Sequence, residues 1–257
     1  MSDWNPGLYT RFEDERTRPA AELLARVPAG AARRVVDLGC GPGNSTELLV
    51  ARYGAASVVG IDNSPAMLKK ARERLPAVRF EPGDIADWSA AEPLDLAYAN
   101  AALQWVPGHE RLFVHLVAQL APGGTLAVQM PDNLDEPSHA LMRETAADPR
   151  FAPSIGDAAA VRARLLTTEG YYDVLAPLAE VDIWRTTYYH RMDDADAIVQ
   201  WLSSTGLRPF LDPLTPALQS LFLDAYRRRI DAAYPARADG KRLLAFPRLF
   251  IVARRRA

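Results

Sequence analysis

A glycine-rich segment, 37–43, carries the residues best suited to binding a ligand. It reads Asp-Leu-Gly-Cys-Gly-Pro-Gly and closes a β-branched run, RVVDL. Gly39 and Gly41 match the start of the dinucleotide fingerprint G-x-G-x-x-G, but Asn44 stands at its last position. Pro42 also removes a backbone N–H where a phosphate would need a donor. The segment therefore predicts a cofactor that approaches the backbone closely without resting a phosphate on it.

Carboxylates stand at or just after the ends of three successive strands. They are Asp37, Asp62 in VVGID and Asp84 in RFEPGD. Asp62 is placed to accept hydrogen bonds from both hydroxyls of a ribose, or else to cap the following helix. Ser64 is the better cap, because Pro65 then takes the first helical position. This leaves Asp62 free for a ligand.

A polar and aromatic segment follows the fourth strand. It reads Asn100-Ala-Ala-Leu-Gln104-Trp105 and would place an amide and a flat ring beside the reacting group. Trp105 could equally be a core aromatic. No pairing of histidine with an acidic residue that would make a general base is evident near it, and the four histidines lack zinc-ligand spacing. We therefore expect no metal site and no general base, and the catalytic residue stays unknown.

The elements that position these residues alternate between short apolar strands and helices. Such alternation predicts an α/β fold with a doubly wound, mostly parallel sheet, because a parallel strand must be reached by a crossover. The predicted strands are 34–38, 57–61, 78–81, 94–98, 125–130, 181–190 and 243–253, which makes seven. The predicted helices are 18–27, 45–53, 65–75, 110–120, 195–204 and 216–234, and Pro122-Gly123-Gly124 is expected to form a tight turn.

The second half of the chain departs from this rhythm. We interpret residues 1–257 as a single domain with helical cap insertions at 131–180 and 191–240, which would bind the substrate at the carboxyl edge of the sheet. Residues 1–30 are expected to form an N-terminal helical lid, in which Tyr9 and Arg16 would close over the cofactor or substrate. An ordinary packing helix at the N-terminus is an equal alternative.

Composition limits the class of protein. The 257 residues include 30 Lys and Arg against 32 Asp and Glu, for a net charge of −2, and 49% are hydrophobic. This excludes a largely disordered chain and a general nucleic-acid binder. A single cysteine and an acidic start without a signal-peptide pattern predict a cytoplasmic location, with no membrane association. A chain of this size can be a monomer.

The pattern Asp-x-Gly-x-Gly-x-Gly in VVDLGCGPGN resembles the first motif of the class I S-adenosylmethionine-dependent methyltransferases. The resemblance implies a Rossmann-like fold and S-adenosyl-L-methionine as cofactor, with Asp37 near its ammonium and sulfonium groups. It also implies that Asp62 binds the ribose. The cofactor-binding residues that the resemblance and the motif together imply are Asp37, Gly39, Cys40, Gly41, Gly43, Asp62, Asn63, Met67, Asp84, Ile85, Asn100 and Tyr9.

Further segments carry a resemblance that concerns the substrate. WNPGLY, FEDERTRPA, ANAALQWV, VQMPDNLDEPSH, TGLRPFL and FPRLF are similar to methyltransferases that esterify a small tricarboxylic acid. The absent D/N-P-P-Y/F sequence makes a nucleic-acid or protein amine acceptor less favoured. A carboxylate is already ionised at neutral pH, so it needs no base. Two alternatives remain: a malonyl-carrier-protein methyltransferase, which shares the glutamine-tryptophan pair, and a non-catalytic cofactor-binding protein.

A polycarboxylate acceptor requires cationic and hydrogen-bonding side chains, with arginine favoured for its two parallel donors. The candidate substrate-binding residues are Gln104, Trp105, Arg16, His139, Tyr171, Tyr172, Arg208 and Arg248. The arginines could instead be surface charges, and the tyrosines could be packing residues.

Overall fold

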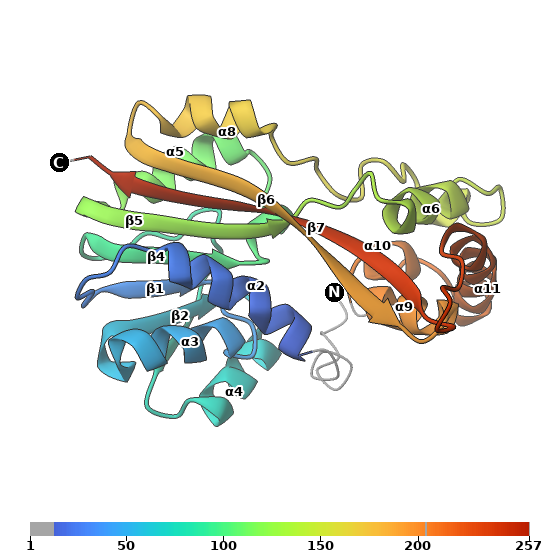
Figure 1. The fold of residues 1–257 in the computed structure, drawn as a ribbon, viewed down its shortest axis with the longest axis horizontal. Helices are drawn as coiled ribbons and strands as arrows, with labels where there is room; N and C mark the ends of the chain where they lie inside the picture. The colour runs from blue at the N-terminus through green and yellow to red at the C-terminus, as the bar shows by residue number, and fades with distance from the viewer. Residues whose placement is uncertain (1–12, 204, 257) are drawn as a thin grey trace. The chain divides into compact units, whose positions relative to one another are not determined.

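A seven-stranded sheet organises the chain in the computed structural model, which describes residues 13–203 and 205–256. The strands are β1 (Val35–Leu38), β2 (Val58–Asp62), β3 (Arg79–Pro82), β4 (Leu94–Asn100), β5 (Leu120–Pro131), β6 (Ala179–Met192) and β7 (Arg242–Arg255). Their order is β3-β2-β1-β4-β5-β7-β6, and Figure 1 shows β5, β4, β1 and β2 side by side. The pairs from β3 to β5 are parallel, whereas β7 is antiparallel to β5. The predicted mostly parallel, doubly wound sheet is confirmed.

The chain divides into two compact units. The sheet unit comprises the described residues of 14–131, 164–186 and 248–257, and the helical unit those of 1–13, 132–163 and 187–247. The strands β6 and β7 each contribute residues to both units. The single domain and the bounds of the lid and cap insertions stay predictions.

Helices cover both faces of the sheet unit: α2 (Glu13–Arg26), α3 (Asn44–Tyr53), α4 (Pro65–Arg74), α5 (His109–Ala118) and α8 (Thr168–Leu175). Inner residues of the strands, such as Val36 and Val128, pack with Phe113 of α5 and Leu175 of α8 in one core. We call this side the α5 face. The strand residues that alternate with these point to the other side of the sheet, which we call the α2 face. There the Tyr98 hydroxyl donates to the Ala20 carbonyl at 2.6 Å.

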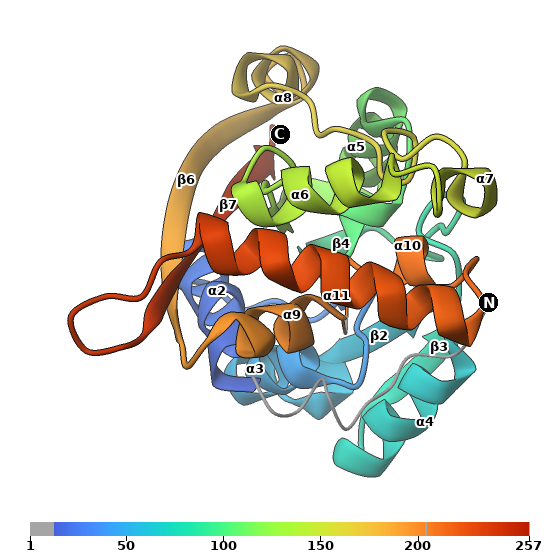
Figure 2. The ribbon, with the colours of Figure 1, turned by 90° about the vertical axis from the view of Figure 1, so that its right-hand side faces the viewer.

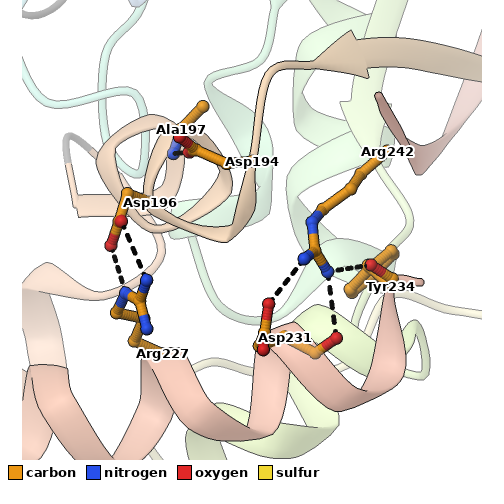
Figure 3. Close-up of polar contacts among 7 residues, drawn as sticks. All are labelled: Asp194, Asp196, Ala197, Arg227, Asp231, Tyr234 and Arg242. Atoms are coloured by element: carbon orange, nitrogen blue, oxygen red, sulfur yellow. Dashed lines mark hydrogen bonds and ion pairs between the residues drawn. The ribbon is translucent and has the colours of Figure 1, made fainter. Parts of the chain in front are cut away.

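The helical unit has its own core. It contains α6 (Pro137–Ala146), α7 (Ala152–Ile155), α9 (Ala195–Ser203), α10 (Arg208–Leu211) and α11 (Pro216–Ala233). Figure 2 shows α11 running beside α6 and α9, and Phe222 and Tyr226 of α11 are fully buried. Polar contacts add to this packing (Figure 3): Arg227 pairs with Asp196 of α9 at 2.5 Å, and Arg242 donates to Asp231 and to the Tyr234 carbonyl.

The structure differs most from the predicted elements in two places. The expected tight turn at 122–124 lies inside β5, where the pairing with β4 jumps from Leu94–Leu120 to Leu96–Thr125. The extra residues form an irregularity that Gly123 accommodates with a φ of 76°. The helix expected at 18–27 begins at Glu13 and includes Pro19 in its interior. The short helices α6, α7, α8 and α10 were not individually predicted.

Candidate functional site

Asp37, at the end of β1, is the most constrained residue of the site. Its side chain is 0% exposed, and Oδ2 accepts hydrogen bonds from Ser45 Oγ at 2.8 Å and Thr46 Oγ1 at 2.6 Å. Oδ1 is buried and has no hydrogen-bond partner in the described structure. Burial raises the pKa of Asp37 to about 6, against the lowering effect of the two hydroxyls. A buried carboxylate with one unpartnered oxygen suits a cationic ligand group.

The glycine turn is tied to the end of β2 by its backbone. The Gly39 and Cys40 amides donate to the Ile61 carbonyl at 2.8 and 2.9 Å, and the Gly41 amide donates to Asp62 Oδ2 at 2.9 Å. The Cys40 thiol is buried, and burial raises its pKa. Gly43 begins α3 as its N-cap residue. The turn is therefore held by backbone contacts, which leaves its outer side for a ligand.

Gly39 and Gly41 require glycine for different reasons. A Cβ on Gly39, whose φ is +71°, would lie 2.4 Å from Ala102 Cβ and 3.3 Å from Ile85 Cδ1. A Cβ on Gly41, whose φ is +55°, would meet no atom within 4 Å among the described residues. The first glycine lets two loops of the site approach each other, and the second faces open space that a cofactor can use.

Replacing Gly39 with alanine should weaken cofactor affinity by roughly tenfold, because the turn must shift away from Ala102 and carry a strained φ. Isothermal titration with S-adenosylhomocysteine measures the change. Adding Ala102→Gly should restore part of the affinity, since it removes the clashing Cβ. Gly30→Ala, where no atom lies within 4 Å of the new Cβ, is the matched control. An equal loss of cofactor affinity in Gly39→Ala and Gly30→Ala would contradict this account.

Asp62 ends β2 and is oriented by the backbone. Its Oδ1 accepts from the Ser64 amide at 2.8 Å while Oδ2 accepts from Gly41, and burial raises its pKa. Ser64 caps α4, accepting from the Met67 amide at 3.4 Å with Pro65 at the first turn, so the predicted cap is confirmed. Each carboxylate oxygen keeps lone-pair capacity for a further donor.

Truncating Asp62 to alanine should weaken cofactor affinity by about 1 to 3 kcal/mol, the usual loss for a charge-assisted hydrogen-bond pair. The same titration measures it. Asp62→Asn keeps the shape and should lose less. Because the carboxylate also holds the Gly41 amide, thermal unfolding of both ligand-free variants must be recorded. If affinity falls only in proportion to the loss of stability in Asp62→Ala and Asp62→Asn, Asp62 does not contact the cofactor.

The remaining residues predicted to contact the adenosine part lie just after β2 and β3, with Met67 in the first turn of α4. Asn63 is exposed and Met67 is buried. Asp84 is exposed and Oδ1 accepts from the Ala86 amide at 3.0 Å, while Ile85 is 9% exposed and packs in the core behind the turn. The structure places these residues at the same sheet edge as Asp37 and Asp62. Their contacts with a cofactor stay predictions.

The segment after β4 forms a strained turn and a short 3-10 helix, η2 (Leu103–Trp105). Ala101 has a φ of +54°, and its carbonyl accepts from Gln104 Nε2 at 2.7 Å. Gln104 Oε1 and Asn100 Oδ1 are buried without a partner in the described chain. Trp105 is 42% exposed, so it is not a core aromatic. Three unpartnered acceptor oxygens, counting Asp37 Oδ1, thus lie at the ends of β1 and β4.

His109 supports η2, a role that sequence reasoning missed. Its Nε2 lies 2.9 Å from the Leu103 carbonyl, and its Nδ1 lies 2.5 Å from the hydroxyl of Tyr171. Tyr171 is fully buried on α8, and its hydroxyl is engaged by His109. Its substrate role stays a prediction. Tyr172, the next residue, is 53% exposed and lines a pocket with Thr168.

The other predicted substrate residues fall in different places. Arg248, on β7 of the sheet unit, is 4% exposed and donates to Gln129 Oε1 at 3.1 Å. Arg208 and His139 lie in the helical unit, where Arg208 is 3.8 Å from Asp212. Tyr9 and the side chain of Arg16 lie outside the described residues. The structure therefore brings Gln104, Trp105 and Arg248 into the sheet unit, whereas His139 and Arg208 belong to the other.

His139 lies among basic side chains of the helical unit. Burial lowers its pKa to about 3, and the charges of Arg162 and Arg143 act in the same direction. Arg162, which sequence reasoning missed, donates to Asn133 Oδ1 at 3.1 Å, and burial lowers its pKa to about 10. His139 is thus neutral at physiological pH. The substrate roles of His139 and Arg208 stay predictions.

Among the described residues, the chain has neither a metal-binding cluster nor a membrane-spanning helix. No group of three or more His, Cys, Asp or Glu side chains within 13–203 and 205–256 is arranged to hold a metal ion. In that same part of the chain, no helix combines the length and the apolar character needed to cross a membrane.

Comparisons with known proteins agree with this geometry. Residues 35–124 match a family described as a methyltransferase domain. The chain is 65% identical over 260 residues to the trans-aconitate 2-methyltransferase of Paracidovorax citrulli (strain AAC00-1), covering 100% of both chains.

Solved structures show a similar fold. The YcgJ protein of Bacillus subtilis has a TM-score of 0.62 at 11% identity, covering 93% of this chain and 99% of its own. Haemonchus contortus phosphoethanolamine N-methyltransferase 2, solved in complex with S-adenosyl-L-methionine, has a TM-score of 0.54 at 17% identity, covering 93% of this chain and 53% of its own.

Proposed function

This chain belongs to the trans-aconitate 2-methyltransferase family, and we propose that its sheet unit holds S-adenosyl-L-methionine at the carboxyl ends of β1 to β4. The enzyme transfers a methyl group from that cofactor to a carboxylate of trans-aconitate, forming a methyl ester. The observation that carries the proposal is the buried Asp37, whose Oδ1 has no partner among the described residues.

The residues present fit a cationic cofactor without a phosphate. When bound, S-adenosylmethionine supplies a sulfonium whose methyl group is the one transferred. Asp37 Oδ1, Asn100 Oδ1 and Gln104 Oε1 offer acceptors and negative potential where its charged groups would lie. The Asp62 carboxylate, oriented by two backbone amides, would accept from the ribose hydroxyls. Gly41 leaves the room that close approach requires.

The reaction neutralises charge, since a carboxylate and a sulfonium give an ester and a thioether. The protein's task is therefore to align donor and acceptor and to exclude water. A carboxylate acceptor has a reference pKa near 4 and is ionised at neutral pH. We therefore assign no general base. The buried Gln104 and the half-exposed Trp105 of η2 would lie beside the reacting carboxylate.

Turnover at saturating trans-aconitate should be nearly independent of pH between about 7 and 8.5, because no side chain must lose a proton in the step. Initial rates with a labelled methyl donor, buffered at constant ionic strength, measure this. A rise of tenfold per pH unit through this range would require a base and would contradict the assignment.

The substrate test separates this function from its alternatives. The protein is incubated with labelled S-adenosylmethionine and either cis-aconitate, trans-aconitate, isocitrate or a malonyl carrier protein, and base-labile label is counted. We expect label on trans-aconitate and less on the related acids. Label on the carrier protein alone would support the carrier-protein alternative. Cofactor binding without label on any acceptor would support a non-catalytic protein.

We also place the enzyme in the cytoplasm as a monomer, on the composition and cysteine count.

A further inference from the structure

The α2 face of the sheet carries a diagonal row of polar residues near its carboxyl edge. Register partners on neighbouring strands project to the same face of a sheet, and so do residues two apart on one strand. Asp37 pairs with Tyr98, two residues before Asn100, and Asn100 pairs with Gln129. Gln129 lies two residues before Pro131, the partner of Arg248. The row therefore crosses β1, β4, β5 and β7 in that order.

The row has hydrogen-bond acceptors at one end and donors at the other. At its β1 and β4 end, the buried atoms without partners are acceptors, Asp37 Oδ1 and Asn100 Oδ1. At its β5 and β7 end, the unpartnered buried atom is a donor, Gln129 Nε2, and the charged group is the Arg248 guanidinium. The orientation of the Gln129 amide follows from its Oε1, which accepts from Arg248 at 3.1 Å.

Gln129 and Arg248 are both buried, and neighbouring residues pack around them. Gln129 is 0% exposed, and its carbonyl accepts from the Ala101 amide at 2.8 Å, which joins it to the turn that carries Gln104. Phe250, the register partner of Gln129, stacks on Trp184 of β6 with ring centroids 4.8 Å apart. The amide and the guanidinium are therefore set in place before a ligand arrives, which lowers the cost of binding.

We propose that Arg248 and Gln129 Nε2 together bind a carboxylate of trans-aconitate that does not receive the methyl group. This rests on the proposed function. With strands about 4.8 Å apart, β7 lies roughly 10 Å from β4, which is far enough for the acid to lie between its anchor and the methyl donor. Gln129 also acts on Arg248 as a positioning residue, through its Oε1.

The anchored carboxylate must be a non-reacting one for an energetic reason. The reacting carboxylate loses its charge in the transition state, so an arginine on it would stabilise the ground state more and slow the reaction. A carboxylate that stays ionised binds Arg248 equally well in both states. The pair therefore contributes to KM and not to kcat.

The competing explanation is that the Gln129–Arg248 contact only holds β5 against β7. Gln129→Glu distinguishes the two, because it keeps the shape and strengthens the contact with Arg248 by adding a charge. If the contact is only structural, Gln129→Glu should leave KM unchanged. If the two residues bind a substrate carboxylate, Gln129→Glu should raise KM, because the new side-chain carboxylate occupies the position of the substrate carboxylate.

The experiment measures KM and kcat for trans-aconitate with the wild type, Gln129→Glu, Gln129→Met and Arg248→Gln. We expect KM to rise roughly 30-fold in Arg248→Gln and Gln129→Glu, with kcat within about threefold, and less in Gln129→Met. Arg254→Gln removes an exposed arginine of the same strand and should leave both constants unchanged. S-adenosylhomocysteine affinity and thermal unfolding report whether each variant keeps its fold.

Three dicarboxylates, each lacking a different carboxylate of trans-aconitate, locate the anchored group: glutaconate, itaconate and mesaconate. Each is measured as a substrate or as a competitive inhibitor. Arg248→Gln should weaken two of them and leave unchanged the one that lacks the anchored carboxylate. Unchanged KM in Gln129→Glu and Arg248→Gln, or equal loss for all three acids, would overturn the proposal. If the wild type methylates none of the acids, the proposed function itself has failed, a different result.

Discussion

Replacing Asp37 with asparagine should lower affinity for S-adenosylhomocysteine by roughly a hundredfold while making the ligand-free enzyme more stable at pH 7.5. The affinity falls because a buried carboxylate is replaced by a neutral amide whose N–H would face the cofactor's ammonium. The stability rises because the native carboxylate is desolvated, with a pKa of about 6 against 3.8 in the unfolded chain. That difference costs the folded wild type about 3 kcal/mol above pH 6.

Asparagine suits this position sterically, since its Oδ1 can accept from Ser45 and Thr46 as Asp37 Oδ2 does. We therefore expect a gain of about 2 kcal/mol in the free energy of unfolding, somewhat less than the full desolvation cost. Chemical denaturation and isothermal titration measure the two changes. Asp87→Asn, at an exposed carboxylate in the same unit, is the control. A variant that loses both affinity and stability would mean that Asp37 is mainly structural.

The cofactor end of the site could be predicted from the sequence because its determinants are local. The glycine spacing in 37–43 and the acid after each of three strands occupy short segments whose roles depend on strand ends alone. The cap at Ser64 followed from the same local chemistry, and the structure confirms it. The ligand role of Asp62 stays a prediction. The Rossmann-like sheet followed from the alternation of strands and helices.

The anion-binding end could not be predicted in the same way, because it depends on strand pairing. Gln129 lies within a hydrophobic strand and resembles a buried core position, and only the antiparallel register of β5 and β7 brings Arg248 to it. In the sequence, Arg248 was one of several equivalent arginines. The support of η2 by His109 and Tyr171 joins residues 62 apart. The irregularity in β5 resembled a turn because glycine and proline occur in both.

The net charge of −2 conceals this arrangement. Within the sheet unit, the acceptors of β1 and β4 and the donors of β5 and β7 separate along one face, as the two opposite charges of the reactants require. Under the proposed assignment, each reactant would meet complementary groups, and the charge that is neutralised would lie between them.

Affinity for the cofactor should decrease on acidification below pH 6, whereas stability of the ligand-free enzyme should increase through the same titration of Asp37. Asp37 must be ionised to attract the ammonium group, which S-adenosylhomocysteine shares with the methyl donor, so its protonation alone lowers affinity by about tenfold per pH unit below its pKa. Folding takes up a proton at Asp37 between pH 3.8 and about 6, so its destabilising effect is absent below 3.8 and complete above 6.

The measurement is isothermal titration of S-adenosylhomocysteine from pH 7.5 to 5, with unfolding curves recorded at the same pH values. Asp37→Asn should show a shallower dependence, because the side chain at position 37 no longer titrates. The difference between the two pH dependences of affinity is the contribution of Asp37. An unchanged dependence in Asp37→Asn would mean that the protonation of Asp37 is not coupled to cofactor binding. The opposite signs of the affinity and stability changes arise because one carboxylate is desolvated in the free enzyme and paired in the complex.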